Sequence, residues 1–172
     1  MTKEICEYCE GTGKLGFQRE TCWFCGGKGC TGKDNKKVFL GGTCNESTWR
    51  DELIPMLKID YFNPVVDDWT EECYQEELKQ RETCDYCLYV ITPRMTGVYS
   101  IAEVVDDSNK RPKKTIFCIL NRDINELDKH EIYFDKAQMK SLDRVGQMVE
   151  RNGGKYFTSL KDVANYLNKE EE

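Results

Sequence analysis

The sequence predicts an α/β protein whose main domain is a flavodoxin-like, doubly wound sheet of five parallel strands, preceded by a small N-terminal zinc-binding module. From Lys37 onward, short apolar runs alternate with longer helical runs, and this alternation favours a parallel sheet with helices on both faces. The segment before Lys37 differs, since five of the ten cysteines fall in the first 30 residues. We therefore expect a zinc module over residues 1–33 and an α/β domain over residues 37–170.

The N-terminal module is predicted from an internal repeat. The runs CEYCEGTGK at residues 6–14 and CWFCGGKGC at residues 22–30 both follow the pattern C-x-x-C-x-G-x-G. Two such turns can complete a tetrahedral four-thiolate zinc site, and structural zinc contributes on the order of 10 kcal/mol to a segment too short to fold alone. We expect one structural zinc per chain, with buried or redox-active thiols as the alternative. The expected ligands are Cys6, Cys9, Cys22 and Cys25.

Five apolar runs of the α/β domain have the length and composition of strands. They are VFLGG at residues 38–42, YFNPVV at 61–66, YCLYVIT at 86–92, TIFCIL at 115–120 and KYFTS at 155–159. The runs between and after them are predicted to be helices. These are STWRDELIPML at 47–57, TEECYQEELKQRE at 70–82, VYSIAEVVDD at 98–107, KAQMKSLDRVGQMVER at 136–151 and SLKDVANYLNK at 159–169. A third C-x-x-C, at residues 84–87, leads into an apolar run, so we expect Cys87 to be a buried thiol of the core.

The helix expected at residues 98–107 contains a carboxylate that needs an explanation. Its predicted buried stripe, at the spacing i, i+3, i+4 and i+7, consists of Val98, Ile101, Ala102 and Val105. Glu103 lies beside that stripe, one turn after Tyr99. The run S-x-x-E is also a capping box, in which Ser100 caps the helix and Glu103 returns to its backbone. Glu103 is therefore either part of a cap or part of a site.

The loops after the first four strands are expected to form one crevice, because ligands of doubly wound sheets bind beyond the carboxyl ends of the strands. The residues that these loops bring there are Gly41, Gly42, Asn45, Asn63, Asp67, Asp68, Trp69, Thr92, Tyr99, Ser100 and Glu103. Neither a P-loop nor a G-x-G-x-x-G fingerprint occurs among them. Trp49 and Trp69 could stack a nucleobase, with a place in the core or in a lid as the alternative.

Two carboxylates in such a crevice suit the cleavage of an N-glycosidic bond. One can attack the anomeric carbon and form a glycosyl-enzyme ester, while the other protonates or orients the departing base. The acidic pair Asp67 and Asp68 also has a plainer interpretation, since acidic residues before a helix interact favourably with its dipole.

Three runs of the α/β domain resemble the nucleoside 2-deoxyribosyltransferase family and its N-glycosidase relatives. The runs are VFLGGTCNESTWRDELIP, YFNPVVDDW and LYVITPRMTGVYSIAEVVDDSNKRP, and the resemblance spans about residues 37–168. It implies that Glu103 is the nucleophile, that Asp67 or Asp68 handles the base or the sugar hydroxyls, and that Ser100 binds phosphate when the substrate is a nucleotide. The chain departs from many transferases at Thr96 and Gly97, where they carry a further Asp, and at Tyr99, where they carry a glycine.

The candidate residues follow from the crevice and the resemblance together. The candidate catalytic residues are Glu103, Asp67, Asp68 and Tyr99. The candidate substrate-binding residues are Gly41, Gly42, Asn45, Trp49, Asn63, Trp69 and Ser100. The N-terminal repeats resemble the cysteine-rich zinc module of DnaJ-type chaperones, with two repeats where those proteins have four.

Composition narrows the classes of partner. The net charge is −6 and basic clusters are few, which gives non-specific nucleic-acid binding little support. No stretch approaches the roughly 18 apolar residues of a membrane span, and the N-terminus lacks the apolar core of a secretory signal. We therefore expect a cytoplasmic protein that acts on a nucleoside or nucleotide, without a membrane.

Two alternatives to an enzyme stay open. One is a module that binds or senses a nucleotide-like ligand without turning it over, and the other is an adaptor that binds a protein partner through the zinc module. The resemblance also leaves open a homo-oligomer whose subunits complete one another's sites.

Overall fold

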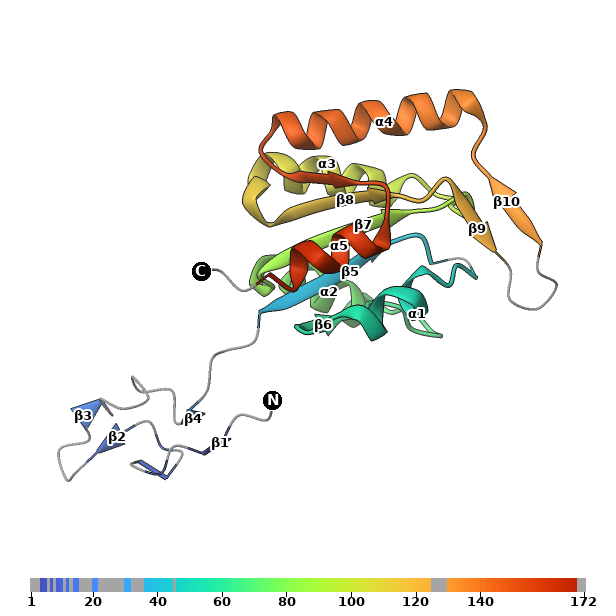
Figure 1. The fold of residues 1–172 in the computed structure, drawn as a ribbon. Helices are drawn as coiled ribbons and strands as arrows, with labels where there is room; N and C mark the ends of the chain where they lie inside the picture. The colour runs from blue at the N-terminus through green and yellow to red at the C-terminus, as the bar shows by residue number, and fades with distance from the viewer. Residues whose placement is uncertain are drawn as a thin grey trace. The chain divides into compact units, whose positions relative to one another are not determined.

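The computed structural model describes residues 4–5, 7, 9–10, 12, 14–15, 20–21, 30–31, 36–44, 46–124 and 130–169 (Figure 1). The chain forms two compact units, Met1–Asn35 and Lys36–Glu172. The described residues of the first unit form two short antiparallel ladders. In one of them β1 (Glu4–Ile5) pairs with β4 (Cys30–Thr31), and in the other β2 (Lys14–Leu15) pairs with β3 (Glu20–Thr21).

The second unit is built on a five-stranded parallel sheet, which confirms the predicted α/β class. Its strands are β5 (Lys37–Gly42), β6 (Asp60–Phe62), β7 (Tyr86–Ile91), β8 (Thr115–Ile119) and β11 (Lys155–Phe157). They lie in the order β11-β8-β7-β5-β6, and every neighbouring pair is parallel. Numbered along the chain this order is 2-1-3-4-5 from the other edge, which is the order of flavodoxin-like sheets.

The helices cover both faces of this sheet. The described helices of this unit are α1 (Trp49–Leu53), α2 (Glu71–Thr83), α3 (Tyr99–Lys110), α4 (Lys136–Arg151) and α5 (Leu160–Leu167). A 3₁₀ turn (Ile54–Met56) follows α1, and another (Pro112–Lys114) follows α3. On one face α1 and α5 pack on alternate residues of β5, β7 and β8, and on the other face α3 and α4 pack on the intervening residues. Because these three strands are buried on both sides, their sequences are continuously apolar rather than alternating.

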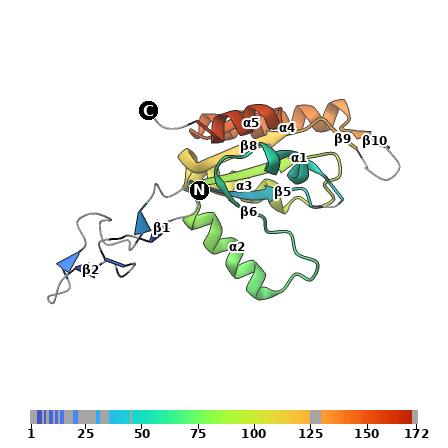
Figure 2. The ribbon, with the colours of Figure 1, turned by 60° about the horizontal axis from the view of Figure 1, so that its bottom comes forward.

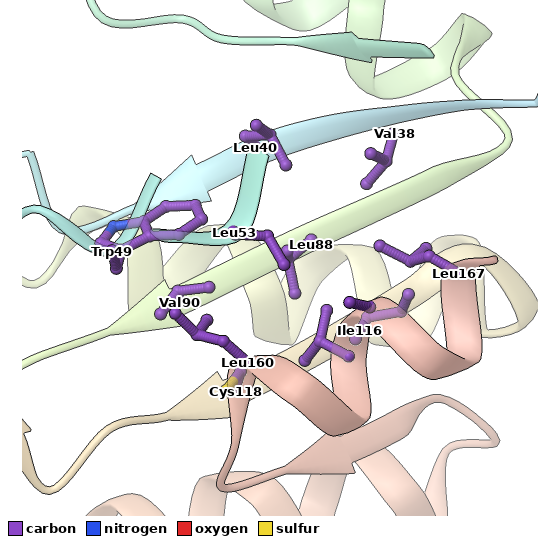
Figure 3. Close-up of a cluster of buried hydrophobic side chains, with 12 residues drawn as sticks. Val38, Leu40, Trp49, Leu53, Leu88, Val90, Ile116, Cys118, Leu160 and Leu167 are labelled. Atoms are coloured by element: carbon purple, nitrogen blue, oxygen red, sulfur yellow. The ribbon is translucent and has the colours of Figure 1, made fainter. Parts of the chain in front are cut away.

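The core beneath α1 and α5 contains Trp49, Leu53 and Leu88 (Figure 3). On the opposite face Cys87 is fully buried, as expected, and burial raises the pKa of its thiol to about 12. Helix α2 differs from the other helices. It extends away from the sheet in Figure 2, and Arg81 is its buried residue. No described helix is long and apolar enough to cross a membrane.

Two local expectations were wrong, and one element was missed. The second strand ends at Phe62 rather than Val66, because this edge strand pairs only with Lys37–Phe39 of β5 and Pro64 has no N–H to extend the ladder. An antiparallel hairpin of β9 (Arg122–Ile124) and β10 (Glu131–Tyr133) was not predicted. On α3, Val98 is 74% exposed and Ala102 is also exposed. The buried residues of this helix are Glu103, Val104, Asp107 and Ser108.

Candidate functional site

A cavity of about 320 Å³ lies at the carboxyl end of β5, between the β6–α2 loop and the first turns of α3. It is lined by Gly41, Gly42 and Cys44 from β5 and its loop, by Val65, Val66 and Trp69 from the β6–α2 loop, by Glu77 from α2, and by Tyr99, Ser100 and Glu103 from α3. A second cavity of about 190 Å³ shares Gly42, Cys44, Tyr99 and Ser100 with it and continues along the loop before α3. A cavity therefore lies at the strand ends, where the crevice was expected.

The floor of the cavity depends on two glycines. Gly42 has a φ of +117°, and a Cβ there would overlap the backbone nitrogen and oxygen of Val90. At Gly41 a Cβ would lie 2.8 Å from ring atoms of Phe39 and Tyr89. Only glycine allows the end of β5 to approach β7 this closely and to keep a backbone conformation disfavoured for other residues. Both glycines therefore shape the floor.

Glu103 supplies a buried carboxylate to the wall of the cavity. Its side chain extends from α3, the residue is 9% exposed, and Oε1 accepts a hydrogen bond of 2.9 Å from Nη1 of Arg81. Burial raises the pKa of Glu103 to about 7, the charge of Arg81 opposes the rise, and the charges of Glu77 and Asp107 add to it. Burial prevails because Arg81 shares its single positive charge with Asp107. The carboxylate is therefore balanced between its two protonation states near neutral pH.

The capping-box interpretation of Glu103 is wrong. The N-cap of α3 is Val98, no side chain makes a cap hydrogen bond there, and Ser100 is already the second residue of the helix. Among the described residues, Arg81 is the hydrogen-bond partner of the Glu103 carboxylate. A cap therefore does not explain why this carboxylate is buried.

The second carboxylate of the cavity is Glu77, which the sequence did not single out. Burial raises its pKa, while a hydrogen bond with the side chain of Trp69 and the charges of Arg81 and Arg50 oppose the rise. Glu77 lies one helical turn before Arg81, so α2 presents both residues on one face. This i, i+4 pair was a signal in the sequence, but it was hidden in a run where charged residues occur at most positions.

The acidic pair of the β6–α2 loop is placed differently. Asp67 and Asp68 are exposed, and neither is among the residues that line the cavity. The same loop turns Val65, Val66 and Trp69 toward it instead. In this structure the pair therefore lies outside the lining of the cavity that contains Glu103.

Aromatic residues form one rim of the cavity. Tyr99 is 57% exposed, and its hydroxyl lies 3.3 Å from that of Tyr74. This hydrogen bond, together with burial and the charge of Glu103, raises the pKa of Tyr99 to about 12. Trp69 is also exposed, and its ring centroid lies 5.8 Å from that of Tyr74. Tyr99 is thus protonated at neutral pH and able to donate a hydrogen bond.

Three further candidates are not among the residues that line this cavity. Trp49 is 1% exposed and donates a hydrogen bond of 2.8 Å from Nε1 to the carbonyl of Thr43, so it belongs to the core and is not available to stack a base. Asn63 accepts a hydrogen bond from the backbone N–H of Val65 and shapes the loop. Thr92 is buried, and its N–H donates to the hydroxyl of Thr43. Asn45 lies outside the described residues.

The expected zinc ligands are only partly described. Cys9 is buried, and its carbonyl accepts hydrogen bonds from both the N–H and the hydroxyl of Thr12, which closes a tight turn after the first C-x-x-C. Cys6, Cys22 and Cys25 lie outside the described residues. Within the part of the chain that is described, no three His, Cys, Asp or Glu side chains are grouped so that they could hold a metal ion.

Comparison with known protein families gives a match for the α/β unit. The sequence model of the family described as nucleoside 2-deoxyribosyltransferase like matches residues 35–122. This range runs from β5 to β8 and includes all the residues that line the cavity. A comparison with curated proteins gave no match.

Proposed function

The chain belongs to the nucleoside 2-deoxyribosyltransferase-like family, and on this premise we propose that it cleaves the N-glycosidic bond of a nucleoside or nucleotide, or transfers the 2-deoxyribosyl group, with Glu103 as the nucleophile. The observation that carries this proposal is the position of Glu103. It is a carboxylate in the wall of the cavity, held by Arg81 and not by the helix backbone.

The proposed reaction uses the two carboxylates of the cavity. An oxygen of ionised Glu103 attacks the anomeric carbon as the bond to the base breaks, giving a glycosyl-enzyme ester. A proton must reach the departing base, and Glu77 is a suitable donor because burial raises its pKa. Water or a second base then attacks the anomeric carbon and displaces Glu103 as a free carboxylate. The proton that this acceptor loses returns to Glu77. Asp67 and Asp68 stay secondary candidates for sugar contacts, since their loop also supplies Trp69.

The rest of the lining supports a nucleoside-shaped ligand. Trp69 and Tyr99 offer aromatic surface to a base, and Tyr99 can donate a hydrogen bond to a sugar oxygen. The adjoining cavity contains Ser100 at the N-terminal end of α3, where the helix dipole favours an anion. We therefore propose that a 5′-phosphate, where the substrate has one, binds beside Ser100.

A panel of nucleosides and 5′-nucleotides tests this function. We expect the purified chain to release free base from at least one member, measured by chromatography against a reaction without protein. Addition of a second base should yield the exchanged nucleoside if the chain is a transferase. A ligand that binds with a measurable Kd but releases no base would favour the sensing alternative, for which the Thr96 departure is the motivation.

We also propose that the N-terminal unit is a zinc module, as the sequence predicts. The first repeat lies between β1 and β2 along the chain and the second between β3 and β4, and the β1–β4 and β2–β3 ladders pair the ends of the two repeats. Ile5, directly before Cys6, pairs with Cys30, and Thr21, directly before Cys22, pairs with Lys14. This pairing and the burial of Cys9 fit a site made from both repeats. Cysteine thiolates suit zinc, whose role here is structural.

Metal analysis tests the zinc module. Protein purified without chelator should contain about one equivalent of zinc per chain, because four thiolates complete one tetrahedral site. Cys9→Ser should lose most of the metal. Cys73→Ser is the control, since Cys73 lies in α2, and it should keep the full amount. Absence of zinc from the unaltered chain, or its retention in Cys9→Ser, would contradict the ligand assignment.

A further inference from the structure

A buried ion-pair network lies directly behind Glu103. Arg81, which is 5% exposed, donates from Nε to Oδ2 of Asp107 at 3.2 Å and from Nη2 to Oδ1 of Asp107 at 2.8 Å. Its remaining terminal nitrogen, Nη1, donates to Oε1 of Glu103 at 2.9 Å. One guanidinium thus joins two carboxylates that lie one helical turn apart on α3.

Asp107 is the inner end of this network. It is 0% exposed, so it cannot touch a ligand in the cavity. Besides Arg81, it accepts a hydrogen bond of 2.6 Å from the hydroxyl of Tyr89 on β7 and lies 3.3 Å from Nε of Arg111. Burial, followed by the charge of Asp107, raises the pKa of Tyr89 and keeps its hydroxyl protonated. Contacts from α2, β7 and the end of α3 therefore fix Asp107.

We propose that Asp107 and Arg81 form a positioning relay for the nucleophile, in which Asp107 orients Arg81 and Arg81 holds Oε1 of Glu103, so that Oε2 is the atom that reacts. This inference rests on the proposed function and deepens it. A bidentate contact restricts the guanidinium far more than a single hydrogen bond does, and Arg81 can therefore fix the orientation of Glu103. Neither Arg81 nor Asp107 touches the substrate in this scheme.

The relay also sets the charge state of Glu103. The charged groups that face this carboxylate are Arg81 and Glu77 from α2 and Asp107 from its own helix, while Tyr89 and Tyr99 lie nearby and are neutral at pH 7. Arg81 favours the ionised form of Glu103, whereas Asp107 disfavours it, both through its own charge and by occupying two of the Arg81 nitrogens. Loss of Arg81 and loss of Asp107 should therefore shift the pKa of Glu103 in opposite directions.

Carboxyl NMR of protein labelled with ¹³C in its glutamate side chains measures this pKa without any substrate, and Glu103→Gln identifies the resonance. Asp107→Asn should lower the pKa of Glu103 by about one unit, and Arg81→Met should raise it by about one unit or more. Asp106→Asn is the matched control. Asp106 is the neighbouring acid on the same helix and is half-exposed, and its Oδ2 lies 4.0 Å from Nη2 of Arg81 but only 2.9 Å from Nζ of Lys110. Its loss should therefore change the pKa of Glu103 far less than Asp107→Asn does.

Arg81→Met could fail to fold, because it leaves Asp107 without its main partner. The double variant Arg81→Met/Asp107→Asn removes both charges, and it should give a Glu103 pKa above that of Asp107→Asn. Opposite shifts in the single variants, or this order for the double variant, support the relay. Equal pKa values in all variants, or shifts of the same sign, overturn it.

The dependence of base release on pH separates the relay from the function itself. In an active chain, kcat rises with pH as Glu103 ionises. The midpoint of this rise should move to lower pH in Asp107→Asn, by the same amount as the NMR pKa of Glu103. The KM should stay within about twofold of its original value. NMR shifts in a chain that releases no base would support the relay and reject the glycosidic function. Base release with an unmoved Glu103 pKa would support the function and reject the relay.

Discussion

Glu103→Gln abolishes base release in the proposed mechanism. The amide keeps the shape of the side chain, but it is a poor nucleophile and cannot form the glycosyl ester. We expect kcat/KM to fall at least about 10³-fold, the range seen when a covalent nucleophile is removed. Asp106→Asn, which changes an exposed acid on the same helix, should stay within about twofold of the original rate. A Glu103→Gln chain that keeps more than a tenth of the activity would contradict the nucleophile assignment.

The raised pKa of Glu103 predicts how the activity and the stability of the chain depend on pH. Only the ionised form of Glu103 attacks, and Glu77 must keep its proton to give it to the base. The value of kcat should therefore rise as Glu103 ionises near pH 7 and fall again where Glu77 loses its proton.

The stability of the native state should fall as Glu103 ionises. The native state holds this proton more tightly than the unfolded chain, whose glutamate has its ordinary value of 4.5, so the free energy of unfolding falls as pH rises from about 4.5 to 7. Glu103→Gln has no carboxyl group at this position, so its free energy of unfolding should fall less between pH 5 and pH 8 than that of the original chain. Urea unfolding at these two pH values measures the difference.

Arg81→Met should destabilise the α/β unit by about 3–5 kcal/mol at pH 7. Burial acts to lower the pKa of Arg81, but the hydrogen bond to Asp107 and the charges of its carboxylate neighbours outweigh burial and raise it. Removing this cation leaves Asp107, which is 0% exposed, as a buried charge with weaker compensation. Adding Asp107→Asn should restore a large part of the loss, since the uncompensated charge is then gone.

Urea unfolding of the single and double variants measures this coupling. Arg122→Met is the matched control, because Arg122 pairs with Glu131 at 3.0 Å on the surface, where both side chains are more than 40% exposed. An exposed pair contributes about 0–1 kcal/mol. If Arg81→Met costs no more than Arg122→Met, or if the double variant is less stable than Arg81→Met alone, the network does not have the role assigned to it.

The strands that are buried on both faces of the sheet were predictable from the sequence. Strands β5, β7 and β8 are covered on both faces, and their continuous apolar runs stand out between polar helices. The hairpin of β9 and β10 gave no such signal, because each strand has three residues and both contain exposed charges. On α3, periodicity misplaced the buried stripe, since it counted only apolar residues. The pairing of Arg81 with Glu103 and Asp107 allows two carboxylates to be buried there.

The candidate site was predictable only where it follows the strand ends. Gly42 is the last residue of β5, and Glu103 lies near the start of the helix that follows the loop after β7. Both are therefore at the carboxyl edge of the sheet, and a rule of topology is enough to locate them. Glu77 and Arg81 lie within α2, whose approach to α3 depends on tertiary packing and not on the local sequence. Trp49 was a candidate because it follows a strand end, but its side chain is buried in the core. The topology rule cannot tell these two placements of an aromatic residue apart.

The most direct test of Glu103 as the nucleophile is covalent trapping. A nucleoside with a 2-fluoro-substituted sugar should react with the chain and leave the fluorinated sugar attached, because fluorine destabilises positive charge at the anomeric carbon and slows breakdown of the ester. Mass spectrometry of the digested protein should place this adduct on the peptide that contains Glu103, and Glu103→Gln should carry none. An adduct on another residue, or an active chain that releases base from this analogue without any adduct, would contradict the account.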